Sequence, residues 1–139
     1  MKRKLGQWAA THEWWALGMI LTVFSGVVFG NMTRWSVWFD EAFSAYLVRF
    51  NITEIAHFTS LDVHPPLYYW LLKGWTSIFG HSTLAIRSLS LVFALVGLVG
   101  LYVVVRYITK RSSYGLAAVT AVALTPVFVR FSHEARMYT

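Results

Sequence analysis

Three apolar segments of this sequence are long enough to cross a lipid bilayer, and no other feature restricts its fold as strongly. They cover residues 14–30, 83–105 and 114–131. A transmembrane helix needs ~20 apolar residues and tolerates ~17, and the bilayer interior offers the backbone no partner except itself. The sequence therefore predicts an all-α, polytopic membrane protein with three transmembrane helices. Because proline has no backbone N–H, Pro126 is predicted to kink the third span.

The composition agrees with a lipid environment. Hydrophobic residues make up 57% of the chain and charged residues only 13%, whereas soluble domains carry about 25% charged residues. Seven Trp and seven Tyr are present, and these residue types gather at membrane interfaces. The chain has no cysteine, which excludes disulfides and thiolate metal sites. Membrane lipids are therefore expected to surround much of the protein.

The distribution of Lys and Arg predicts how the chain crosses the membrane. Residues 1–13 and 106–113 together carry six of these cations, whereas the much longer loop 31–82 carries three. Lys and Arg collect on the cytoplasmic side of a membrane protein. The N-terminus and residues 106–113 are therefore expected in the cytoplasm, and the long loop on the outer side. The net charge of +6 follows this topology, so no nucleic-acid partner is expected.

The long outer loop is predicted to contain short helices. One covers residues 41–48, with Asp40 near its N-cap, and a second covers 53–58. Residues 67–79 are apolar and aromatic but too short to span, so they are expected to form an amphipathic helix in the membrane interface. In the segment 62–66 before it, the residues that precede the two prolines are not expected to be helical, because each proline biases its predecessor to extended geometry.

Asp40-Glu41 is the first of three clusters of polar residues on the predicted outer side. A carboxylate at the start of a helix, beside the membrane, can act as general base on an acceptor hydroxyl. The alternative is that Asp40 only caps its helix, which contributes ~1 kcal/mol.

The second cluster contains Asp62 and His64. The two prolines that follow hold the backbone, so these side chains are expected to point in a definite direction. The alternative is a rigid turn that only starts the interfacial helix. Together with His133 and Glu134 they could also supply nitrogen and oxygen ligands to a divalent metal, although their spacing is not a metal signature. The need for a metal stays open.

The third cluster, residues 132–138, follows the third span and includes Glu134 and Arg136. Arg87 and Arg130 lie near the predicted outer ends of the second and third spans. Placing an Arg at membrane depth costs ~2.5 kcal/mol or more unless its side chain reaches the interface or pairs with an opposite charge. The planar guanidinium group also binds phosphate with two parallel hydrogen bonds. These residues indicate a lipid-phosphate site at the outer leaflet, with ordinary snorkelling to headgroups as the alternative.

Taken in order, the three clusters resemble motifs of the polyprenyl-phosphate-sugar-dependent glycosyltransferases with the GT-C fold. Within that class the chain is similar to the bacterial branch of the dolichyl-phosphate-mannose protein mannosyltransferase family (glycosyltransferase family 39-like). The motifs are Trp38-Phe39-Asp40-Glu41-Ala42, Asp62-Val63-His64-Pro65-Pro66-Leu67-Tyr68-Tyr69, Arg87-Ser88-Leu89-Ser90 and Ser132-His133-Glu134-Ala135-Arg136-Met137-Tyr138.

The resemblance covers nearly the whole chain but only the beginning of such enzymes. Residues 1–139 are therefore expected to form the N-terminal part of a single membrane domain, and to be inactive alone. The resemblance implies that Asp40 is the catalytic base and that Glu41 is its partner in the catalytic motif. The substrate-binding residues that it implies are Asp62, His64, Arg87, Glu134, Arg136 and Tyr138.

The activity that the resemblance implies is inverting transfer of a sugar at the outer face of the membrane. The donor would be a polyprenyl-phosphate-linked sugar and the acceptor a hydroxyl of a protein, lipid or glycan. A non-enzymatic three-span scaffold or assembly subunit is the alternative. A transporter fits less well, because the acids lie in surface loops and not at mid-membrane.

Overall fold

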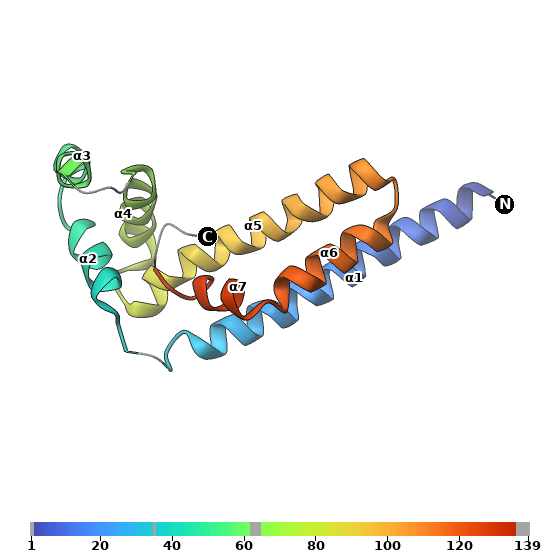
Figure 1. The fold of residues 1–139 in the computed structure, drawn as a ribbon, viewed down its shortest axis with the longest axis horizontal. Coiled ribbons are helices and arrows are strands. Elements are labelled where there is room, and N and C mark those ends of the chain that lie inside the picture. Colours follow the sequence, from blue (N-terminus) through green and yellow to red (C-terminus); the bar gives the residue numbers. More distant parts are fainter. Residues whose placement is uncertain (1, 35, 62–64, 136–139) are drawn as a thin grey trace.

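The computed structural model describes residues 2–34, 36–61 and 65–135, with side chains from residue 12 onward, and this part of the chain is helical (Figure 1). The helices are α1 (Lys2–Asn31), α2 (Phe39–Leu47), α3 (Ile52–Leu61), α4 (Leu67–Phe79), α5 (Thr83–Thr109), α6 (Ser112–Ala123) and α7 (Pro126–Phe131). The all-α prediction is therefore confirmed for these residues.

Helices α1, α5 and α6 run side by side along the long axis of the molecule (Figure 1). Their shared core includes Phe24 and Val28 of α1, Leu98 of α5 and Val119 of α6. Close approach of α5 and α6 depends on Gly115, because a Cβ at this position would lie 2.8 Å from Cδ2 of the Tyr102 ring. The small residue thus lets α6 pack directly on α5.

Two helices among the described residues are long and apolar enough to cross a membrane, at positions 12–31 and 83–109. They contain the first two predicted spans. The third predicted span, 114–131, is divided between α6 and α7, and α6 alone has 12 residues. The membrane-spanning character of this third segment therefore stays a prediction.

The division between α6 and α7 occurs at the predicted proline. Helix α6 ends at Ala123, and Pro126 begins α7. Proline cannot donate to the preceding turn but fits the first position of a helix, where that donor is not needed. The rings of Phe128 and Phe24 stack with centroids 5.6 Å apart, which seats α7 on α1. The expected kink is a complete break.

Helices α2, α3 and α4 gather at the end of the molecule opposite the N-terminus, and α4 runs across the direction of α5 (Figure 1). The Nε1 of Trp75 donates to the carbonyl oxygen of Ala85 at 3.0 Å and thereby fixes α4 to α5. Helix α4 has the bounds that the sequence predicted, and it ends before Gly80, whose φ of 83° suits glycine.

The predicted start of α2 needs a correction. The N-cap is Trp38, and Asp40 lies within the first turn of the helix. The reason is Glu41, whose Oε2 accepts the backbone N–H of Trp38 at 3.2 Å and so secures a start two residues earlier than expected.

Candidate functional site

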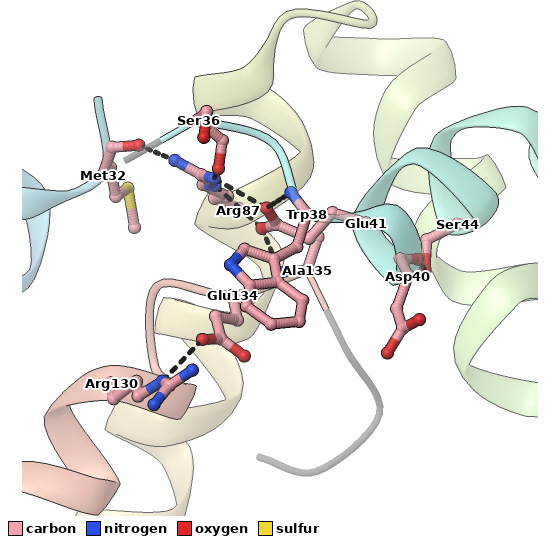
Figure 2. Close-up of polar contacts among 10 residues, drawn as sticks. All are labelled: Met32, Ser36, Trp38, Asp40, Glu41, Ser44, Arg87, Arg130, Glu134 and Ala135. Atoms are coloured by element: carbon pink, nitrogen blue, oxygen red, sulfur yellow. Dashed lines mark hydrogen bonds and ion pairs between the residues drawn. The ribbon is translucent and has the colours of Figure 1, made fainter. Parts of the chain in front are cut away.

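The centre of the site is a buried ion pair between Glu41 of α2 and Arg87 of α5 (Figure 2). Arg87 Nε donates to Glu41 Oε1 at 2.8 Å, and Arg87 Nη2 donates to Oε2 at 2.6 Å. This is the bidentate fork geometry that makes Arg–carboxylate pairs strong. The two side chains are 2% and 4% exposed.

The same two side chains bind backbone groups of two further segments. Arg87 donates through Nη1 to the carbonyl oxygen of Met32 and through Nη2 to that of Ser36, the latter at 3.4 Å. Glu41 Oε1 accepts the N–H of Ala135 at 2.9 Å. The pair therefore joins α2, α5, the loop after α1 and the segment after α7.

These contacts explain why the carboxyl group stays charged although it is buried. Burial alone would raise the pKa of Glu41. The hydrogen bonds from Arg87, Ala135 and Trp38 outweigh this effect and hold the pKa below its ordinary value. A buried ion pair compensates its loss of hydration only when such additional hydrogen bonds are present.

Asp40 lies beside the pair but faces a different direction. Its residue is exposed, and its carboxylate points away from the Glu41–Arg87 pair (Figure 2). The rigid contacts of Glu41 fix the first turn of α2 and therefore the backbone from which Asp40 projects. The adjacent acidic residues thus have separate environments, one enclosed and one open to the surroundings.

A cavity of about 510 Å³ adjoins the ion pair. Its wall combines Trp38, Glu41 and Arg87 with Arg130, His133 and Glu134. Arg130 Nε donates to Glu134 Oε1 at 2.9 Å, and the Arg130 side chain is 63% exposed. The cavity is therefore bordered by the enclosed Glu41–Arg87 pair and by an exposed cation, Arg130.

An apolar groove of about 340 Å³ lies next to this cavity, between α1 and the break that separates α6 from α7. Met19, Val23 and Leu124 are among its lining residues. Val129 borders both the groove and the polar cavity. The polar cavity, which contains Arg130, and the apolar groove thus meet at α7.

The structure brings together three of the residues that the sequence proposed for the site, because Glu41, Arg87 and Glu134 all line the cavity. Asp40 is not among the described lining residues. Asp62, His64, Arg136 and Tyr138 lie outside the residues that the structure describes. Their roles, and those of the residues that are described, stay predictions.

Sequence reasoning missed the backbone partners of the pair. The carbonyl groups of Met32 and Ser36 and the N–H of Ala135 complete its hydrogen bonds. Side-chain patterns do not report on backbone contacts. The available signal was indirect: an Arg at membrane depth needs a partner, and Glu41 is one of the few acids in the sequence.

No group of three or more His, Asp or Glu residues is placed to hold a metal in the part of the chain that the structure describes. His133 instead donates through Nδ1 to the carbonyl oxygen of Val129 at 2.9 Å. The predicted metal set also needs Asp62 and His64, which fall outside the described residues. The possible metal is therefore still a prediction.

Two helices of membrane-spanning length, with a polar cavity at one end of their bundle, point to the class of integral membrane proteins. Residues 63–137, more than half of the chain, match the family of dolichyl-phosphate-mannose-protein mannosyltransferases. The chain belongs to this family of membrane glycosyltransferases. Searches of curated proteins and of solved structures gave no significant match.

Proposed function

We propose that this protein transfers a sugar from a polyprenyl-phosphate donor to an acceptor hydroxyl at the non-cytoplasmic face of the membrane. Family membership supports the class of reaction. The single observation that carries the donor assignment is the junction of the polar cavity with the apolar groove at α7. A lipid phosphate needs both environments, one for its charge and one for its chain.

In this proposal the polyprenyl chain lies in the groove and the phosphate lies beside Arg130. The guanidinium group of Arg130 is exposed and can exchange its ion pair with Glu134 for one with a phosphate, which it binds through its N–H donors. Such a cation stabilises the negative charge that develops on the departing phosphate. Arg136 is proposed to assist from the same segment.

Asp40 is proposed as the general base. Its carboxylate takes the proton from the acceptor hydroxyl while the acceptor oxygen bonds to the anomeric carbon of the sugar. The bond from that carbon to the phosphate oxygen breaks, and polyprenyl phosphate leaves with the electron pair. Attack from the side opposite the phosphate inverts the configuration, and a phosphate needs little help from an acid. The acceptor is a hydroxyl of a protein, as the family name suggests, or of a lipid or glycan.

For Glu41 and Arg87 the geometry favours a positioning role. Each is nearly enclosed, and each already uses its polar atoms on the other and on the backbone. We propose that they hold α2 so that Asp40 faces the acceptor, and that Asp62, His64 and Tyr138 shape the remaining wall of the site.

The test compares Asp40→Asn with Asp40→Glu in the full-length protein reconstituted in vesicles. The assay follows transfer of radiolabelled mannose from a polyprenyl-phosphate donor to a peptide acceptor. Asp40→Asn should lower kcat by about a hundredfold or more with little change in KM, since general base catalysis contributes roughly 10²–10⁴-fold. Asp40→Glu should retain part of the rate.

Near-normal transfer by Asp40→Asn would remove this residue from the role of base while leaving the glycosyltransferase intact. Failure of the unmodified protein to transfer mannose or any other sugar from polyprenyl-phosphate donors would favour the scaffold alternative.

A further inference from the structure

A second cavity, of about 530 Å³, lies outside the site described above, between the turn after α2 and the helix α4. Its size is within the range of ligand sites, which is about 300–1,000 Å³. Among its described lining residues three are basic, Arg49, Lys73 and His81, and none is acidic. The proposed transfer reaction assigns no role to this cavity.

Two of the side chains that line this cavity are held in place by hydrogen bonds. Lys73 Nζ donates to the carbonyl oxygen of Val48 at 3.1 Å, which uses one of its three N–H donors and leaves two. Trp70 Nε1 donates to the carbonyl oxygen of Ile52 at 3.1 Å and fixes the aromatic wall. Arg49 and His81 are exposed. Two fixed side chains and two exposed basic side chains therefore line the same cavity.

The cavity lies at the end of the bundle where the two helices of membrane-spanning length end and begin. Helix α1 ends and α5 begins at this end of the bundle, and α4 runs across it (Figure 1). In α4, Ile78 is 75% exposed, Phe79 57% and Trp70 37%. Exposed apolar side chains beside cations form the pattern of a surface that contacts the membrane interface.

We propose that this cavity binds the phosphate group of an anionic lipid headgroup. Arg49 supplies a planar guanidinium group that can bind two phosphate oxygens at once, and Lys73 supplies an ammonium group. His81 supplies a further N–H donor, and together these groups suit phosphate oxygens. The described lining residues of the cavity include these basic side chains and no acidic one. A soluble phosphate offers the same chemistry, and the experiment separates the two sources.

Gly74 allows the cavity to be blocked without disturbing the fold. It lines the cavity, and a Cβ added there meets no atom within 4 Å. A larger side chain would therefore project into empty space. Gly97 in α5 is a matched control, because an added Cβ also meets nothing within 4 Å and the residue does not line the cavity.

The experiment measures binding of phosphatidylglycerol to the purified full chain in a non-ionic detergent, by native mass spectrometry. An uncharged diacylglycerol glycolipid is the negative probe, and inorganic phosphate is the competitor. Arg49→Gln should weaken phosphatidylglycerol binding about fivefold, since one Lys or Arg near an anionic lipid contributes about that factor. Gly74→Leu should abolish it, and Gly97→Leu should leave it unchanged.

Competition by millimolar inorganic phosphate would support a phosphate site that also accepts soluble ligands, whereas binding of the lipid alone would assign the site to headgroups. Equal binding of phosphatidylglycerol by the unmodified chain, by Gly74→Leu and by Arg49→Gln would overturn the proposal. Sugar transfer is not read in this experiment, so the result stands apart from that of the proposed reaction.

Discussion

Replacement of Glu41 by glutamine tests the central ion pair most directly. Each carboxylate oxygen accepts two hydrogen bonds, Oε1 from Arg87 and Ala135 and Oε2 from Arg87 and Trp38. Glutamine offers only one acceptor oxygen. Whichever way the amide turns, its NH₂ group faces two donors, so Glu41→Gln removes two hydrogen bonds and places donors against each other.

The magnitude follows from the enclosure of the pair. Breaking one partner of a buried, hydrogen-bonded ion pair costs about 3–5 kcal/mol. This is a large part of the roughly 5–15 kcal/mol that stabilises an ordinary folded domain. The double variant Glu41→Leu with Arg87→Met should recover part of the loss, because apolar residues remove the need to hydrate either charge. Recovery should be incomplete, because the carbonyl groups of Met32 and Ser36 also lose their donor.

The assay is unfolding of the purified protein in mixed detergent micelles by added sodium dodecyl sulfate, followed by far-UV circular dichroism. Glu54→Gln is the matched control, since Glu54 accepts the N–H of Asn51 at an exposed helix start, where a glutamine oxygen serves equally well. A free energy of unfolding for Glu41→Gln within about 1 kcal/mol of the unmodified protein would refute the reasoning.

Two further predictions concern pH and packing. Because folding lowers the pKa of Glu41, the ionised carboxylate should stabilise the fold fully above its ordinary pKa of 4.5, and this stabilisation should be lost as the pH falls below that value. Unfolding midpoints measured between pH 7 and pH 3 check this. The double variant Glu41→Leu with Arg87→Met should show a flatter pH profile. Gly115→Ala should lower the free energy of unfolding by about 1–3 kcal/mol, because the new methyl group collides with Tyr102. In Gly100→Ala the added Cβ meets nothing within 4 Å, so this variant should be neutral or stabilising. Equal unfolding midpoints for the two variants would contradict the packing argument.

The sequence predicted those parts of the fold that depend on local patterns. Hydropathy located α5, and the apolar run between Pro66 and Gly80 predicted α4 with its bounds. The break at Pro126 followed from the missing N–H of proline. Each of these features is encoded in neighbouring residues, so a single sequence is sufficient to find it.

The core of the candidate site could not be predicted in the same way. Glu41 and Arg87 are 46 residues apart in the chain, and Ala135 contributes a backbone group with no side-chain signature. The motif that contains Asp40 and Glu41 indicated a functional pair. It did not indicate that one carboxylate would be enclosed by hydrogen bonds and the other exposed. That difference arises from packing between distant segments.

The hydrogen bond from Ala135 to Glu41 has a consequence for biosynthesis. The two residues are 94 positions apart, so a nascent chain presents Glu41 long before its last donor has been synthesised. Until then the carboxylate on α2 lacks one of its four hydrogen bonds. The segment after α7 then brings the amide that completes the hydrogen bonds of Glu41.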